Sequence, residues 1–179
     1  MKTIPTQRFC LHLVVGPPAS GKTTFACQLA AERRAALVDI DVATEPIVRA
    51  ALAALGTSPD DRDSPFFKNT FRDPIYDALF AIADSNLDHV DVVLTGPFTR
   101  EFSQPDWLED VALQCLSRPA PVIAYYMDCP PKELFERLKR RANPRDAAKL
   151  ADWDTYHAYY GNAKPPLFPH RRISATTSS

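Results

Sequence analysis

Residues 16–23 read Gly-Pro-Pro-Ala-Ser-Gly-Lys-Thr, which completes the pattern G-x-x-x-x-G-K-[ST]. The apolar run Phe9–Val15 precedes this segment, and a helix-like stretch, Thr24–Arg34, follows it. Strand, glycine loop and helix form the context in which successive backbone N–H groups and a helix N-terminus cradle phosphates. The sequence therefore predicts a nucleotide-binding loop made of Gly16, Pro17, Pro18, Ala19, Ser20, Gly21, Lys22, Thr23 and Thr24.

Two side chains of this loop have predicted roles of their own. In this motif the lysine reaches the β- and γ-phosphate oxygens, and the hydroxyl that follows it holds Mg²⁺. Lys22 is therefore a predicted catalytic residue, and Thr23 a predicted metal ligand.

Bulk composition limits the remaining possibilities. A chain of 179 residues with 45% hydrophobic residues predicts one globular domain over residues 1–179. The net charge of −1 argues against nucleic acid and membrane surfaces as partners. No secretory leader or membrane-length apolar run is recognisable, and the four cysteines show no C-x-x-C spacing. We therefore expect a cytoplasmic protein with buried, reduced thiols, whose oligomeric state the sequence leaves open.

Apolar runs alternate with helical patterns along the chain. Strands are predicted at 9–15, 36–40, 90–95, 121–127 and near 171–174, and helices at 22–34, 44–55, 70–87, 105–117, 131–142 and 152–160. This alternation is typical of an α/β fold, with a mostly parallel sheet covered by helices on both faces. Residues 56–65 are polar and turn-rich. We expect a substrate-selecting insertion at about 56–73 and a flexible tail at 175–179.

Candidate carboxylates follow the second predicted strand. A right-handed crossover places the carboxyl end of that strand beside the phosphate loop. Asp39 and Asp41 stand there at i and i+2, so a strand would direct both to one face. Asp41 is predicted to bind the substrate and accept the proton of an attacking hydroxyl, and Asp39 to hold Mg²⁺. The alternative is that one of them caps a helix beginning near Thr44.

The third predicted strand ends at Thr95, where many P-loop NTPases have a metal-binding aspartate. This substitution makes Asp39 more plausible as a metal ligand. Thr95 is predicted to contact substrate or orient a Mg²⁺-bound water, or else it belongs to an ordinary strand-ending turn.

A basic helix begins at Pro131. Arg137 and Arg141 share one face at i and i+4, and Arg145 follows the break at Asn143-Pro144. Arginines on a mobile lid neutralise a transferring phosphoryl group and exclude water, so 131–150 is a predicted arginine-rich lid. Arg145 is added to the nucleotide-binding residues. The alternative is a solvated basic face, with Lys139 and Arg140 as its most solvated members.

Another pair, Arg72 and Asp73, stands near a predicted helix start. The two side chains could contact substrate. Equally, Asp73 could cap the helix, with Pro74 at its first position.

Taken together, these motifs resemble those of small P-loop kinases. That group includes shikimate and gluconate kinases, chloramphenicol phosphotransferase, zeta toxins, polynucleotide 5′-kinases and AAA-type kinases with an arginine lid. The resemblance covers about 9–160 and rests on the loop at 16–24, on Asp39-Ile40-Asp41, on Leu94-Thr95-Gly96 and on the arginines of 137–145. Gly96-Pro97 stands where shikimate kinases have Gly-Gly, so the resemblance names no acceptor.

The resemblance implies a three-layer α/β/α P-loop fold and an ATP- and Mg²⁺-dependent phosphotransferase. The predicted partners are ATP and a small molecule that accepts the phosphoryl group on a hydroxyl. Two other functions remain open, a polynucleotide 5′-hydroxyl kinase and a regulatory ATPase or nucleotide switch.

Overall fold

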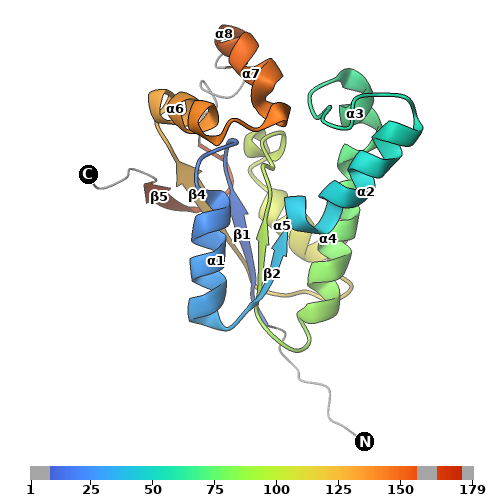
Figure 1. The fold of residues 1–179 in the computed structure, drawn as a ribbon. Helices are drawn as coiled ribbons and strands as arrows, with labels where there is room; N and C mark the ends of the chain where they lie inside the picture. Colours follow the sequence, from blue (N-terminus) through green and yellow to red (C-terminus); the bar gives the residue numbers. More distant parts are fainter. Residues whose placement is uncertain (1–8, 157–164, 175–179) are drawn as a thin grey trace, which may run out of the picture.

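In a computed structural model, which describes residues 9–156 and 165–174, the chain forms one parallel sheet (Figure 1). Its strands are β1 Leu11–Val15, β2 Ala36–Asp39, β3 Val92–Thr95, β4 Val122–Asp128 and β5 Arg171–Ser174. Their order is β2-β3-β1-β4-β5, and every pairing is parallel. The predicted α/β class and all five predicted strands are confirmed, and the sheet is wholly rather than mostly parallel.

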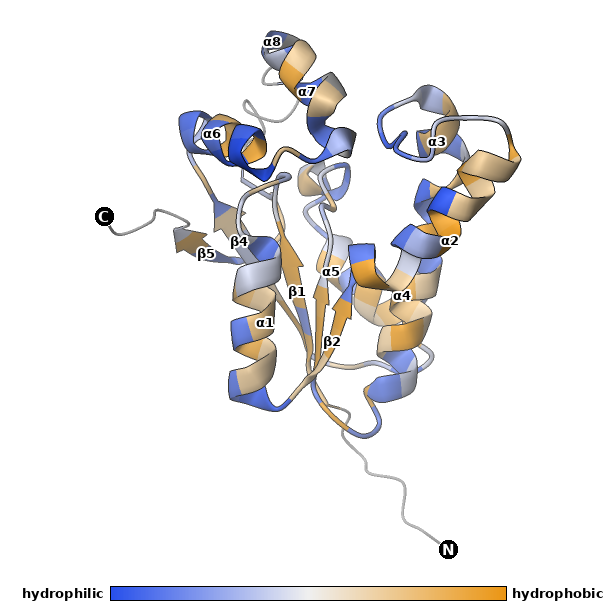
Figure 2. Ribbon diagram, viewed as in Figure 1, coloured by the Kyte–Doolittle hydropathy of each residue, from blue (hydrophilic) through white to orange (hydrophobic). Residues whose placement is uncertain are grey.

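Helices cover both faces of the sheet. Helix α1, Lys22–Arg33, packs Ala26, Leu29 and Ala30 against one face. Helices α4, Arg72–Asn86, and α5, Trp107–Asp110, pack against the other through a larger core. Strand β1 is buried along its whole length, as a strand between two helical layers must be. Figure 2 shows the apolar strands enclosed between these layers.

Helix α2, Ile40–Ala54, begins earlier than the predicted start near Thr44. The cause is the Asp39 carboxylate, which accepts hydrogen bonds from the backbone N–H groups of Asp41 and Val42 and so caps the helix. Asp41 therefore lies in the first helical turn. The argument that both carboxylates lie on one face of a strand is wrong, because the backbone changes from strand to helix between them.

The region between α2 and α4 contains a short helix that the sequence analysis did not predict. Helix α3, Pro65–Thr70, is capped by the Ser64 hydroxyl, which accepts from the N–H of Phe67. The predicted helix at 70–87 is therefore α4 alone, with Phe71 between the two helices. Phe67 joins Val48 and Leu52 of α2 in a small separate core, so the insertion packs on α2.

The segment predicted as one helix at 105–117 is α5 followed by a π-helical turn, Val111–Cys115. A 3₁₀ turn, Glu101–Ser103, precedes it. The predicted lid, 131–150, contains α6 Pro131–Arg141, the 3₁₀ turn Pro144–Asp146 and most of α7 Ala147–Ala151, and α8 Trp153–Tyr156 follows it. Helix 152–160 was predicted, but residues 157–160 lie outside the described chain, as does the tail 175–179.

Figure 1 places these lid helices above the carboxyl ends of the strands, opposite α3.

All four cysteines are free thiols, but Cys27 and Cys115 are exposed, so the prediction of buried thiols is wrong for this pair. Cys27 faces solvent on the outer side of α1, and Cys115 ends the π-helical turn. Among the helices that the structure describes, none combines the length and apolar character needed to cross a membrane.

Candidate active site

The loop after β1 has the geometry of a phosphate cradle, and two of its glycines are required by it. Gly21 has φ 93° and directly precedes α1, so the backbone enters the helix from the left-handed region. At Gly16, φ is 149°, and a Cβ atom would lie 3.1 Å from both Met127 and the Ser20 hydroxyl. Side chains at these positions would distort the loop or push it away from β4.

The Lys22 ammonium lies inside this loop, where it donates a hydrogen bond to the carbonyl oxygen of Pro17 at 2.7 Å. The pKa of Lys22 is lowered to about 8, mainly by desolvation and to a smaller degree by the Arg141 guanidinium. The carboxylates of Asp41 and Asp39 act in the opposite direction, and Asp41 acts more strongly. Lys22 therefore lies within electrostatic reach of both Asp41 and Arg141, which come from helices far apart in the sequence.

Oxygen atoms suited to a hard cation lie beside the lysine. The Thr23 hydroxyl donates to Asp39 Oδ2 at 3.1 Å, while Asp39 Oδ1 caps α2. A hydroxyl and a carboxylate, with phosphate oxygens and waters, form the ligand set that Mg²⁺ prefers, so the residues fit that ion. In the described chain no three His, Cys, Asp or Glu residues cluster as a metal site, so nucleotide oxygens would have to complete the coordination.

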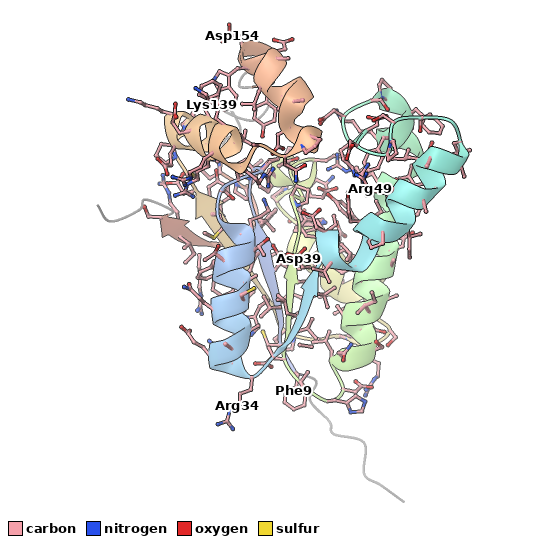
Figure 3. All side chains as sticks on the ribbon, in the orientation of Figure 1. Phe9, Arg34, Asp39, Arg49, Lys139 and Asp154 are labelled. Atoms are coloured by element: carbon pink, nitrogen blue, oxygen red, sulfur yellow. The ribbon has the colours of Figure 1, made fainter. Side chains whose placement is uncertain are left out.

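Thr95 is buried at the end of β3, and its hydroxyl donates to the carbonyl oxygen of Val14 at 3.3 Å. Figure 3 shows Asp39 at the end of β2, between the loop and α2. The carboxyl ends of β1, β2 and β3 thus bring the loop, Asp39 and Thr95 together, as predicted for a parallel sheet.

Two lid arginines also reach the loop region. Glu133 accepts from Arg137 Nε at 2.8 Å, and a guanidinium nitrogen of Arg137 lies 3.5 Å from where a Cβ on Gly21 would be. The buried carboxylate of Asp146 accepts two hydrogen bonds from Arg141, at 2.8 and 2.5 Å. Both arginines therefore line the cavity that the loop borders, and each is paired with a carboxylate.

Three other basic residues of the predicted lid are Lys139, Arg140 and Arg145. Lys139 projects away from the sheet and lies over the Phe135 ring, 5.2 Å from its centroid, as expected of a solvated residue (Figure 3). Arg140 is exposed, as expected, and also lines the active-site cavity. The backbone of Arg145 lies in the 3₁₀ turn, but its side chain is outside the described part of the lid.

These residues surround a cavity of about 960 Å³, within the usual size range of small-molecule sites. Its wall includes residues from the loop, from α2, from the insertion, from the start of α4 and from the lid. The predicted site residues on this wall are Pro18, Ala19, Ser20, Gly21, Lys22, Thr23, Thr24, Asp39, Asp41, Arg72, Thr95, Arg137 and Arg141. The loop residues Gly16 and Pro17 are buried and do not line the cavity.

Arg72 and Asp73 diverge although they are adjacent in sequence. Arg72 lines the cavity and donates to Glu101 at 3.3 Å. Asp73 is 68% exposed and pairs with Arg100 at 2.8 Å, outside the cavity wall. Because Phe71 precedes the first helical residue, neither side chain caps α4.

Sequence reasoning missed one cavity pair altogether. The Lys149 ammonium of α7 lies 2.8 Å from the Asp63 carboxylate of the insertion, and Lys149 is buried. Both residues line the cavity, so this ion pair links the lid to the insertion across it. No local motif marks either residue, because the pairing depends on how two distant segments meet.

Comparison with known proteins identifies the family. A family model described as an AAA domain matches residues 11–163. The chain belongs to this AAA-domain family. No curated protein sequence matches it significantly.

Solved structures with the same fold include several kinases. A candidate kinase from Chloroflexus aurantiacus is 19% identical over 95% of this chain and 90% of its own, with a TM-score of 0.65. A sugar kinase from Janibacter is 19% identical over 94% of this chain and 86% of its own. The APS kinase of Mycobacterium tuberculosis, solved with AMPPNP and APS, is 17% identical over 96% of this chain and 91% of its own. Both have TM-scores of 0.57. The fold is that of P-loop kinases, which supports a nucleotide-dependent phosphotransferase.

Proposed function

We propose that this protein transfers the γ-phosphoryl group of ATP to a hydroxyl of a small molecule, with Mg²⁺ as cofactor. The observation that carries the proposal is the position of Lys22. This loop lysine interacts electrostatically with the Asp41 carboxylate of α2 and with the Arg141 guanidinium of the predicted lid, and all three line one cavity. A base, a phosphate-binding cation and a charge-neutralising arginine around one point are the parts that phosphoryl transfer needs.

The nucleotide half of the cavity has the following assignments. The loop amides and Lys22 bind the phosphates, and Thr23 and Asp39 would hold Mg²⁺, which neutralises phosphate charge when bound. Arg137 and Arg141 lie over the transferring group and stabilise the charge on its equatorial oxygens. Arg145, at the following turn, is proposed to contact the nucleotide as the lid closes.

The acceptor half is lined by residues of α2, the insertion and α4. The acceptor oxygen attacks the γ-phosphorus as the bond to the β–γ bridging oxygen breaks, and ADP leaves. Asp41 takes the proton of the attacking hydroxyl. Thr95 and Arg72 contact the acceptor, while Asp73 is left at the rim by its pairing with Arg100.

The direct test is ADP release from Mg²⁺·ATP in the presence of sugars, hydroxy acids, nucleosides, aminoglycosides and 5′-hydroxyl oligonucleotides. Stimulation by one small-molecule class would support the proposal and name the acceptor class. Stimulation by oligonucleotides alone would favour a polynucleotide kinase. Slow turnover that no acceptor changes, together with tight ATP binding, would favour a regulatory ATPase.

The lowered pKa of Lys22 predicts a pH-dependent nucleotide affinity. Below about pH 8 the ammonium is already protonated in the free protein, so affinity should be flat. Above this value the bound polyphosphate must draw a proton onto Lys22, and Kd should rise by up to about tenfold per pH unit. Calorimetry of ADP binding in buffers of different ionisation enthalpy should detect that proton uptake. A Kd that stays constant from pH 7 to pH 9.5 would contradict the assignment.

The ion pair between Asp63 and Lys149 predicts an effect on closure. Replacing Lys149 by Met should raise the acceptor KM by about three- to tenfold and increase ATP hydrolysis without acceptor, because water enters a cavity that no longer closes. The double variant Asp63→Asn/Lys149→Met should behave like the single one. Asp88→Asn, which alters an exposed pair with Arg118, is the matched control. Unchanged KM and unchanged background hydrolysis would show that the pair does not gate the cavity.

A further inference from the structure

A chain of four alternating charges runs from the insertion to the end of α6. Asp63 Oδ2 lies 2.8 Å from the Lys149 ammonium, and that ammonium lies 3.9 Å from Asp146 Oδ1. The other oxygen of this second carboxylate, Oδ2, accepts two hydrogen bonds from Arg141, at 2.8 and 2.5 Å. All four residues line the cavity, so the chain connects the insertion with an arginine that the proposed function assigns to the phosphoryl group.

Asp146 is the central anion of this chain, and its side chain is only 2% exposed. Helix α6 ends at Arg141, and Ala142, with φ 47°, turns the backbone back. The N–H of Asp146 donates to the carbonyl oxygen of Asn143 at 2.8 Å, within the turn that returns the carboxylate to Arg141. A buried carboxylate that accepts two hydrogen bonds from one guanidinium sets the direction of that guanidinium, because a misaligned pair would leave buried charge uncompensated.

The two cations that face Asp146 are not equivalent. Arg141 donates both hydrogen bonds, whereas Lys149 lies nearer to Asp63 than to Asp146. Without the Asp63 carboxylate, the Lys149 charge would depend more strongly on Asp146 and would compete with Arg141 for it. Asp63 therefore leaves the Asp146 carboxylate to Arg141.

We infer that Asp146 is a positioning residue, which directs Arg141 toward the transferring phosphoryl group while Asp63 of the insertion holds Lys149. This inference rests on the proposed function. Arg141 lies within electrostatic reach of Lys22, so its direction matters most when negative charge develops beside that ammonium. The contact between the insertion and α7 thereby controls the chemistry at the phosphates, and an acceptor bound between them acts on it through this contact.

The first test separates catalysis from binding. Asp146→Asn should lower kcat by about 10- to 100-fold and leave the Kd of ADP within about threefold, because the Arg141 guanidinium remains but is misdirected. Asp146→Glu should recover part of kcat, and Asp88→Asn, in an exposed pair with Arg118, should change nothing. In an Arg141→Gln background, Asp146→Asn should add less than about a twofold loss. An equal loss of kcat in both backgrounds, or a Kd that rises as much as kcat falls, would overturn the inference.

The shared carboxylate also predicts a rescue. Asp63→Asn should lower kcat by about three- to tenfold, since Lys149 then competes with Arg141 for Asp146. Adding Lys149→Met should restore kcat because the competing ammonium is removed, although the acceptor KM stays raised. A double variant as slow as Asp63→Asn would contradict the competition, since the loss of a merely structural ion pair is not repaired by removing its second member.

A third measurement does not depend on an acceptor. The Kd of Mg²⁺·ADP is compared with the Kd of Mg²⁺·ADP plus aluminium fluoride, which imitates the transferring phosphoryl group. Asp146→Asn and Arg141→Gln should each reduce the preference for the fluoride complex by about tenfold, and the two together should reduce it no further. That result would support the positioning role even if no hydroxyl acceptor is found. An unchanged preference in Asp146→Asn would refute the role, even if phosphoryl transfer to a small molecule is demonstrated.

Discussion

Replacing Asp41 by Asn should reduce kcat for phosphoryl transfer by about 100- to 10,000-fold while changing the Kd of ADP by less than about threefold. The carboxamide keeps the size of the side chain but cannot take the proton of the attacking hydroxyl. Helix α2 should be unaffected, because its cap is the Asp39 carboxylate rather than Asp41. Acceptor-dependent ADP release and equilibrium ADP binding, measured on the same preparation, check both parts.

The neighbouring carboxylate offers a matched control. Asp39→Asn should raise the Mg²⁺ concentration needed for half-maximal activity, because Asp39 faces Thr23 rather than the acceptor. It should also lower the melting temperature slightly, since a cap is weakened. Full transfer activity of Asp41→Asn at saturating substrate would show that Asp41 is not the base.

Lys22→Met should lower kcat by about a thousandfold and weaken nucleotide binding by at least about tenfold, because a preorganised charge at the β- and γ-phosphates is lost. The variant should nevertheless fold as well as the parent. Desolvation of the ammonium opposes folding of the free protein, as the lowered pKa of Lys22 shows, and Met removes that cost. Melting temperatures with and without ADP separate the two effects.

In the free state the Lys22→Met melting temperature should equal or exceed that of the parent. With saturating ADP the parent should gain more, since stabilisation by a ligand grows with its affinity. A variant that binds ADP normally, or that retains more than about a tenth of the parent kcat, would contradict the role given to Lys22.

The nucleotide half of this site was predictable because its residues are close in sequence. The loop, Lys22 and Thr23 belong to one motif, and the parallel topology places Asp39 beside them. The sequence did not show which local hydrogen bonds Asp39 makes. Asp39 both caps α2 and faces Thr23, so the two readings of that residue, cap and metal ligand, are compatible rather than exclusive.

The acceptor half depends on long-range packing, which the sequence does not display. Asp63 and Lys149 meet only because α7 and the insertion face each other across the cavity, and Glu101 faces Arg72 only because the chain folds back after β3. Gly96 allows that return, since a Cβ there would lie 2.9 Å from the ring of Phe98. The adjacent pair Arg72-Asp73 looked like one feature, yet tertiary contacts direct the two side chains to different places.

The central claim is that the γ-phosphoryl group goes to a hydroxyl of a small molecule. The most direct measurement follows ATP radiolabelled in its γ-phosphate, with the acceptor panel, and determines how the label divides between acceptor and inorganic phosphate. We predict that label enters one class of small hydroxyl compound, at a rate that rises with its concentration and falls in Asp41→Asn. Label recovered only as inorganic phosphate, at a rate that no acceptor alters, would contradict the account.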